Sequence, residues 1–135
     1  MSRWTCPKCA REFGRAGQSH VCFPALTPDD TFARHPREQR AAYDAVMTHL
    51  QDLGPVHEDA VEVGVFLKHH RKIAELRPMK RWLALYVCLP RRVTSSRVTR
   101  TFAPSGGRTW HVIRLHAADD VDDQVKSWLS EAYFA

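Results

Sequence analysis

Residues 82–89 read WLALYVCL, and this stretch decides the fold. Its side chains are apolar at both alternating sets of positions, which is typical of a strand covered on both faces. Eight residues are too few for a membrane span, which needs about 18–20 apolar residues. The sequence therefore predicts a strand in the middle of a sheet.

Further strands are expected on both sides of this central one. Residues 61–68 alternate with a period of two, and a polar break separates them from the apolar residues 73–76. Residues 98–102 and 109–115 flank the sequence Pro-Ser-Gly-Gly at 104–107, which favours a hairpin turn. Together with residues 82–89, these patterns predict about five strands.

Two amphipathic helices are predicted, one before the strands and one after them. Residues 36–53 place apolar side chains on one helical face and end at Gly54-Pro55, a strong stop. Residues 121–133 carry a wide apolar stripe, and aspartates crowd the start of that helix, where carboxylates cap free N–H groups. Short connections favour an antiparallel sheet with both helices on one face. The expected fold class is α+β.

The N-terminal segment contains a pattern of metal ligands. Cys6, Cys9, His20 and Cys22 follow the spacing Cys-x2-Cys-x10-His-x-Cys, and four N/S ligands suit a tetrahedral zinc ion. A Cys-x-x-Cys redox pair is the alternative, but such a motif is expected inside a larger domain. Four protein ligands would close the metal's coordination shell, so the predicted Zn²⁺ site is structural. Twenty-two residues bury too little apolar surface to fold without such a metal.

The chain of 135 residues therefore divides into three parts. Residues 1–22 form a predicted zinc knuckle, residues 23–36 contain three prolines and are interpreted as a linker, and residues 37–135 form the α+β domain. No long apolar run and no secretory signal are visible, so a cytoplasmic protein that does not associate with membranes is expected.

Positive charge is concentrated in the middle of the chain. Between Phe66 and His116 there are twelve Lys and Arg residues against one acidic residue, Glu75. Such a segment favours binding to nucleic acid or to an acidic partner, although arginines also simply cover open sheet faces. Aromatic residues lie between the cations, at Trp82, Tyr86, Phe102 and Trp110. The candidate anion-binding residues are Lys68, Arg71, Lys72, Arg77, Arg81, Arg91, Arg92, Arg100 and Arg114.

Two other functions fit the same sequence. A small enzyme acting on a phosphorylated or anionic small molecule would use His69, His70, Arg114 and His116, although the two adjacent histidines also suit a polar turn. A plain protein-interaction module is the third possibility. No catalytic residue is assigned, and Cys88 is expected to be a small buried hydrophobe. An acidic group at Glu58, Asp59 and Glu62 is interpreted as a solvated edge rather than a cation site.

Several segments carry a family resemblance. Residues 64–68, 73–78, 83–90 and 110–115 and the ending from Asp119 to Tyr133 resemble the bacterial domain of unknown function 5655. The resemblance implies a small α+β domain, sometimes attached to restriction-like or other nucleic-acid-associated modules, and it implies no catalytic residues. The N-terminal segment resembles short Cys-Cys-His-Cys zinc knuckles, including a zinc segment that precedes such domains.

Overall fold

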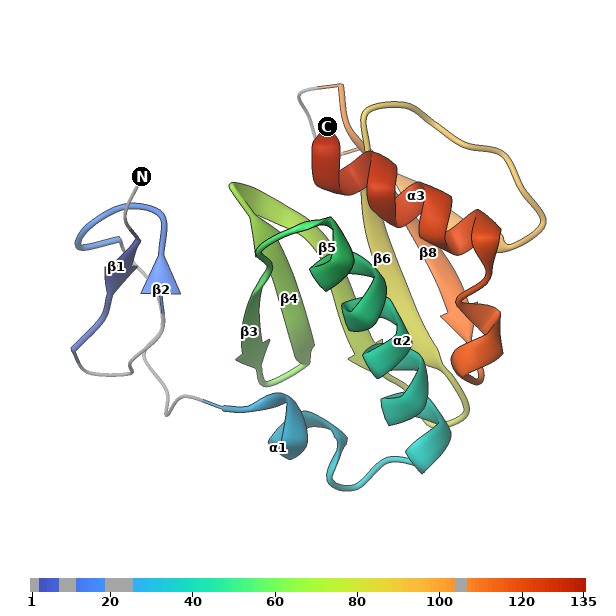
Figure 1. Ribbon diagram of the computed structural model, residues 1–135, viewed down its shortest axis with the longest axis horizontal. Coiled ribbons are helices and arrows are strands. Elements are labelled where there is room, and N and C mark those ends of the chain that lie inside the picture. The colour runs from blue at the N-terminus through green and yellow to red at the C-terminus, as the bar shows by residue number, and fades with distance from the viewer. Residues whose placement is uncertain (1–2, 8–11, 19–25, 104–106) are drawn as a thin grey trace.

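The computed structural model describes residues 3–7, 12–18, 26–103 and 107–135. In these residues two long helices cross one face of an antiparallel sheet (Figure 1). The helices are α1 (Pro28–Phe32), α2 (Arg37–Leu53) and α3 (Asp123–Phe134), with a short 3-10 helix, η1 (Ala118–Asp120), before α3. The sheet contains β3 (His57–Val61), β4 (Gly64–His69), β5 (Arg71–Pro78), β6 (Leu83–Leu89), β7 (Val98–Phe102) and β8 (Thr109–Leu115). The predicted α+β class is confirmed.

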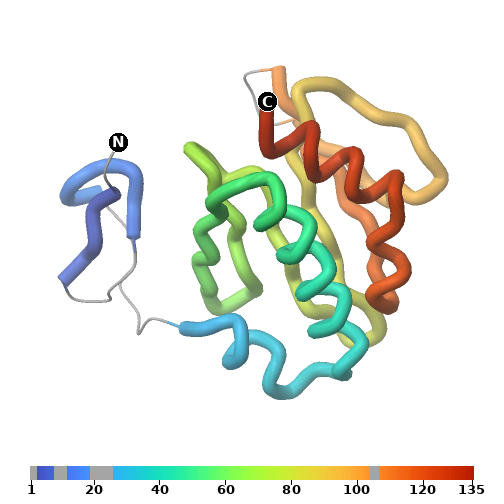
Figure 2. The backbone as a smooth tube through the Cα atoms, in the orientation of Figure 1, coloured from blue at the N-terminus to red at the C-terminus, as the bar shows by residue number. Residues whose placement is uncertain are grey.

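The strands lie in the order β3-β4-β5-β6-β8-β7, and each pair is antiparallel. The predicted central strand is confirmed, because β6 pairs with β5 on one side and β8 on the other. Between β6 and β7 the chain must pass β8, which it does through the segment at residues 90–97 (Figure 2). This crossing leaves β7 at the edge of the sheet.

The expected count of five strands is wrong, because the large sheet has six. The alternation over residues 61–68 comes from the last residue of β3 and most of β4, joined by a two-residue turn at Glu62 and Val63. A two-residue turn preserves the alternation, so the sequence pattern continues through it. Val63 is 52% exposed at this turn, although the pattern placed it inside a strand. Gly64 then lies so close to β5 that a Cβ would stand 2.1 Å from the carbonyl oxygen of Leu76.

The apolar core lies between the sheet and the helices. On β6 the side chains of Leu83, Leu85, Val87 and Leu89 are fully buried in it. Helices α2 and α3 pack side by side over the sheet, as both backbone views show (Figures 1 and 2). Burying each such side chain contributes about 1.5–3 kcal/mol, so this one strand supplies a large share of the stability.

The helix ends follow the sequence signals. Gly54 ends α2 with a φ of 152°, which favours glycine, and Asp122 caps α3 by accepting a hydrogen bond from the Val125 N–H at 3.1 Å. Residues 23–36 are interpreted from the sequence as a linker, but in the structure they include the helix α1. There, Thr27 and Asp30 form a capping box that starts α1.

The described N-terminal residues form a small hairpin of their own. Strand β1 (Trp4–Thr5) pairs with β2 (Glu12–Phe13), with Trp4 opposite Phe13. Cys6 and Phe13 are buried in a separate apolar cluster with Trp4. The hairpin contacts the edge of the large sheet, where a Glu12 carboxylate oxygen lies 3.3 Å from Nδ1 of His57.

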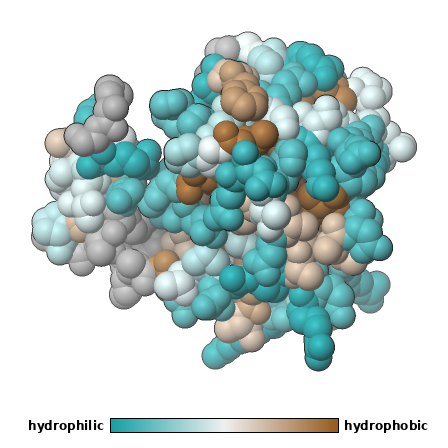
Figure 3. Space-filling model, viewed as in Figure 1, coloured by the Kyte–Doolittle hydropathy of each residue, from teal (hydrophilic) through white to brown (hydrophobic). Residues whose placement is uncertain are grey.

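The exterior of the helix-covered side is largely polar. Figure 3 shows hydrophilic surface over most of this view, with hydrophobic residues in separate patches. Among the described residues, no helix combines the length and the apolar character that crossing a bilayer requires.

Candidate functional site

The sheet face that α2 and α3 do not cover is called the outer face here. Alternation along each strand sends every second side chain to it, and the strand register aligns these side chains in rows. Its cations are Lys68, Lys72, Arg77, Arg100 and Arg114, and its carboxylates are Asp59 and Glu75. Its aromatic side chains are Phe66, Tyr86, Phe102 and Trp110, with Trp82 just before β6.

A buried carboxylate lies near the middle of this face. Glu75 is only 3% exposed, although it lies on the side away from the helices. Lys72 donates to one of its oxygens at 2.9 Å, and Arg77 donates to the other. The two cations are therefore held on either side of one carboxylate. Sequence reasoning missed this role, although Glu75 is the single acidic residue in the basic segment.

The same cations lie over aromatic rings. Lys72 Nζ stands 4.2 Å from the ring centre of Phe66, and the guanidinium of Arg77 stands 4.9 Å from that of Tyr86. A cation at such a distance is attracted to the ring face. In the register, Phe66 and Tyr86 flank Glu75 on β4 and β6, so rings and cations together shield its carboxylate.

A second carboxylate on this face is also buried. Asp59 on β3 is 5% exposed and pairs with Lys68 Nζ at 2.8 Å. The interpretation of residues 58, 59 and 62 as a solvated acidic edge is therefore wrong for Asp59. The reason is the extra strand, which turns Asp59 onto the outer face, opposite Phe66. Glu58 instead accepts a hydrogen bond from the hydroxyl of Tyr43 on α2.

Two arginines of the outer face make no ion pair in the described part of the chain. Arg100 lies over the ring of Phe102 at 5.5 Å, and Arg114 lies over Trp82 at 4.1 Å. Both residues are exposed. They supply positive charge that the carboxylates of this face do not neutralise.

Three aromatic rings form a cluster over β6, β8 and β7. The ring centres of Phe102 and Trp110 are 6.3 Å apart and nearly parallel, at 11°. Tyr86 meets Phe102 edge-on at 6.4 Å. Phe102 is 41% exposed, so part of its ring is open to solvent. The ring cluster formed by Tyr86, Phe102 and Trp110 therefore faces solvent at its β7 end.

The remaining candidate cations lie away from the outer face. Arg91 makes a two-fold contact with Glu131 on α3, with both N–O distances at 2.9 Å. Arg71 donates to the backbone oxygen of Ala135 at 2.6 Å. Arg81 is exposed in the turn between β5 and β6. The structure thus brings five of the nine candidate residues together and separates the others from them.

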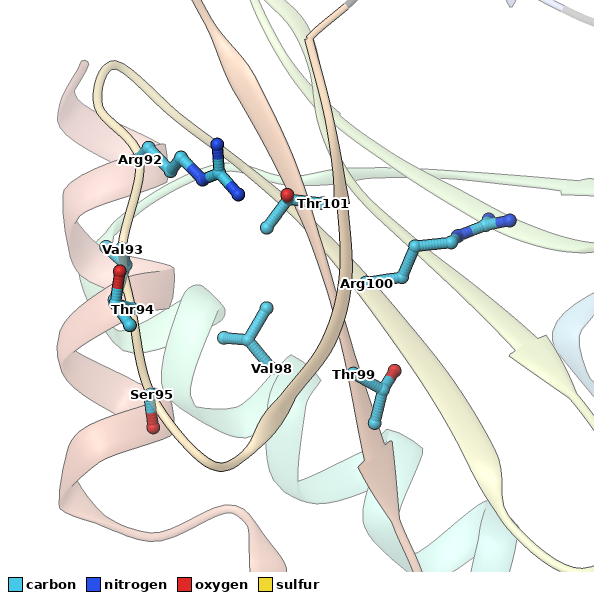
Figure 4. Close-up of a pocket in the computed structure, with 8 residues that line it drawn as sticks. All are labelled: Arg92, Val93, Thr94, Ser95, Val98, Thr99, Arg100 and Thr101. Atoms are coloured by element: carbon cyan, nitrogen blue, oxygen red, sulfur yellow. The ribbon is translucent and has the colours of Figure 1, made fainter.

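Arg92 lines a polar pocket beside β7. The pocket has a volume of about 230 Å³ and lies between residues 92–95 of the crossing segment and residues 98–101 (Figure 4). The guanidinium of Arg92 extends toward Thr101, whereas Arg100 extends away from the crossing segment (Figure 4). None of the described residues that line the pocket is an Asp, Glu, His, Cys or Lys. Arg92 could therefore contact an anion there, but these residues provide no acid–base pair.

The four residues considered for an enzyme are not brought together. His69 and His70 lie at the turn between β4 and β5, and the ring of His69 stacks on Tyr133 at 3.9 Å. Burial lowers the pKa of His69. Arg114 and His116 lie at the end of β8, toward the opposite end of the sheet in the strand register.

Two reactive side chains are buried in the sheet. His111 faces the core, where its Nε2 accepts a hydrogen bond from the Val93 N–H at 2.9 Å. Burial lowers the pKa of His111, which favours its neutral form. Cys88 is buried on the other face, and burial raises the pKa of its thiol. A raised thiol pKa suits the predicted hydrophobic role of Cys88.

The predicted zinc ligands fall mainly outside the described residues. Of the four, the structure describes Cys6, whereas Cys9, His20 and Cys22 lie outside. Cys6 is buried and directly follows β1, so its sulfur lies where strand β1 ends. Among the described residues no three His, Cys, Asp or Glu side chains gather in a way that would hold a metal. The zinc site remains a prediction.

Comparison with known protein families gives one match, over residues 28–134. The match begins at the first residue of α1 and takes in the whole six-stranded sheet and α3. The match starts within the range that is interpreted as a linker, and the four predicted zinc ligands lie outside it. No curated protein and no solved structure matches the chain. The match covers most of the sequence, and the chain therefore belongs to the family described as domain of unknown function (DUF5655).

Proposed function

We propose that this protein is a binding module for nucleic acid and that its binding surface is the outer face of the sheet. The observation that carries the proposal is the gathering of five cations and five aromatic side chains on the one sheet face that the helices leave uncovered. Lys and Arg neutralise phosphates, and aromatic rings offer flat apolar surfaces to bases.

The charge on this face is smaller than the sequence count suggests, and it is unevenly placed. Lys68 is neutralised by Asp59, and Lys72 and Arg77 share Glu75. Arg100 and Arg114 keep their full charge and stand over rings. These two arginines are therefore expected to contribute most of the attraction for phosphates.

An acidic protein would also be attracted to these arginines. It would have to supply an apolar side chain for Phe102 in addition to its carboxylates, whereas each nucleotide brings a phosphate and a flat base together. Catalysis finds less support, because His69 and His70 lie far along the sheet from Arg114 and His116. Binding to nucleic acid is thus the function that uses both the charge and the rings.

The proposal is tested by fluorescence anisotropy with labelled DNA and RNA over a range of salt concentrations. The variant Arg100→Glu/Arg114→Glu is expected to lose at least about tenfold in affinity at low salt and to have a shallower salt dependence, since two phosphate contacts are removed. The control Arg37→Glu/Lys126→Glu changes the net charge equally, at exposed positions of α2 and α3. Equal losses in both variants, or no salt-dependent binding by the unaltered protein, would refute the proposal.

A structural zinc ion in the N-terminal segment is the second part of the proposal. The donors would be Cys6, Cys9, His20 and Cys22, whose thiolate and imidazole chemistry suits zinc. Its support is their spacing, together with the burial of Cys6 beside Phe13. Purified protein is expected to contain one zinc ion per chain, and Cys9→Ala is expected to lose it. A zinc-free protein, or a Cys9→Ala variant that retains full zinc, would exclude this site.

A further inference from the structure

We infer that the nucleic acid bound by the outer face is single-stranded and that two or three of its bases stack on the ring cluster of Tyr86, Phe102 and Trp110. The inference rests on the proposed function and makes it specific. It depends on the arrangement of the rings, whereas the proposed function depends first on the charges.

The ring cluster has the form of a stacking platform. Phe102 and Trp110 lie opposite each other on β7 and β8, and their nearly parallel rings are 6.3 Å apart. Tyr86 continues the cluster onto β6. Aromatic side chains on neighbouring strands of an open sheet can each take one base. A cluster of three rings therefore has room for two or three stacked bases.

The exposed ring of Phe102 points to what covers the platform. Trp110 and Tyr86 are half-buried, whereas Phe102 is 41% exposed on the edge strand. Covering an exposed aromatic face with a base is favourable by about 1–3 kcal/mol. Stacking is independent of sequence to a large extent, because every base has a flat face.

Cations border the same rings. Lys72 Nζ stands 5.2 Å from the ring centre of Trp110, and the guanidinium of Arg100 stands 5.5 Å from that of Phe102. A base that stacks on either ring takes the ring face from the cation over it, and that cation then lies within reach of the phosphates of the same nucleotide. Lys72 is held in place by Glu75, so one of these cations is oriented before binding.

A duplex cannot use this platform in the same way. Its bases are already stacked on their neighbours, so it offers phosphates and groove edges instead of base faces. Charge alone would favour the duplex, which has more phosphates per unit length than a single strand. A preference for the single strand would therefore have to come from the rings.

Three DNA probes of one length separate these contributions for the full-length protein. They are a 15-nucleotide oligothymidine, an abasic 15-mer with the same phosphates but no bases, and a 15-base-pair duplex. At equal salt the oligothymidine is expected to bind about tenfold more tightly than either of the others. Phe102→Leu keeps an apolar side chain but removes the ring, and it is expected to lose about tenfold toward oligothymidine only.

The matched control is Phe134→Leu, at a phenylalanine that is 70% exposed on α3. It should leave the affinity for all three probes unchanged, and thermal melting should show that both variants fold. If all three probes bind according to charge, and Phe102→Leu binds as the unaltered protein does, the single-strand inference is wrong while the proposed function stands. If no probe binds in a salt-dependent manner, both fail.

Discussion

The two faces of the sheet differ most clearly along β6. Leu83, Leu85, Val87 and Leu89 point to the helices, whereas Ala84, Tyr86 and Cys88 point to the outer face. Both sets are largely buried. The first set is covered by two helices, and the second by the long cationic and aromatic side chains of neighbouring strands. An apolar strand therefore need not lie between two layers of backbone.

The buried polar groups show the same contrast. On the core face burial lowers the pKa of His111, which accepts a hydrogen bond from the backbone N–H of Val93. On the outer face Glu75 is buried between two cations that donate to it. The outer face thus carries paired charges around Glu75 and, at Arg100 and Arg114, charges without an ion pair among the described residues. The outer face therefore combines neutralised and exposed charges, whereas the described core face of β6 is apolar.

The largest effect on stability is expected on the core face. Leu85→Ala removes a fully buried side chain and leaves a cavity, so it should lower the free energy of unfolding by about 2–5 kcal/mol. Phe102→Leu on the outer face should lower it by no more than about 1.5 kcal/mol, because the side chain is 41% exposed and mainly its ring contacts are lost. Urea denaturation measures both values. Similar losses of unfolding free energy in the two variants would contradict the claim that the core face contributes more to stability than the outer face.

An intermediate effect is expected at Glu75. Glu75→Gln leaves Lys72 and Arg77 near each other without the shared carboxylate, and it should cost about 1–3 kcal/mol. Both cations are partly exposed to solvent, which limits the cost. Urea denaturation of this variant provides the value. An unchanged free energy of unfolding would show that the ion pairs of Glu75 with Lys72 and Arg77 do not stabilise the fold.

The same variant separates stability from binding. Because Glu75→Gln removes a negative charge from the outer face, its affinity for oligothymidine at temperatures where it is folded should not fall. A loss in affinity there would mean that the orientation of Lys72 and Arg77 matters more than the net charge.

A small effect is expected at the cap of α3, a helix that packs on the core face of the sheet. Asp122→Ala should cost about 1 kcal/mol at pH 7, while affinity for nucleic acid should not change. The hydrogen bond from the Val125 N–H, followed by the contact with Arg97, lowers the pKa of Asp122 below its ordinary value. A carboxylate with a lowered pKa stabilises the fold above the ordinary pKa, and this contribution is lost as the pH falls through the lowered value.

The stability difference between Asp122→Ala and the unaltered protein should therefore shrink as the pH falls below about 4. Urea denaturation at several pH values measures this trend. Asp122→Asn is the matched control, since an asparagine still caps the helix but carries no charge. A difference that stays constant down to pH 2 would contradict the assigned role of the carboxylate.

Much of the fold could be predicted from periodicity, because burial on one face imposes it. The helix before the sheet, the central strand and the two strands β7 and β8 follow directly from such patterns, whereas residues 104–106 of the predicted turn lie outside the described residues. The turn at Glu62 and Val63 could not be predicted, since it contains no turn-forming residue and keeps the alternation. Missing it also hid the strand that carries Asp59.

The candidate site was predictable only in part. The composition of the basic segment indicated cations and aromatics, but not which of them share a face. That depends on the strand order, in which β8 lies between β6 and β7. The burial of Glu75 depends on side chains from three strands and has no local signal. Arg91 and Arg71 contributed to the sequence count of charge, yet both make contacts elsewhere.

The four tryptophans provide the most direct test of the outer face. Trp82 and Trp110 lie on it, Trp128 lies in the core on α3, and Trp4 lies in the N-terminal hairpin. Their indole N–H signals can be followed together in a ¹H–¹⁵N NMR titration of the full-length protein with oligothymidine. Binding at the outer face predicts that the signal of Trp110 moves most and that of Trp82 also moves, while those of Trp128 and Trp4 stay in place. Movement of Trp4 or Trp128 with Trp82 and Trp110 unchanged would contradict it.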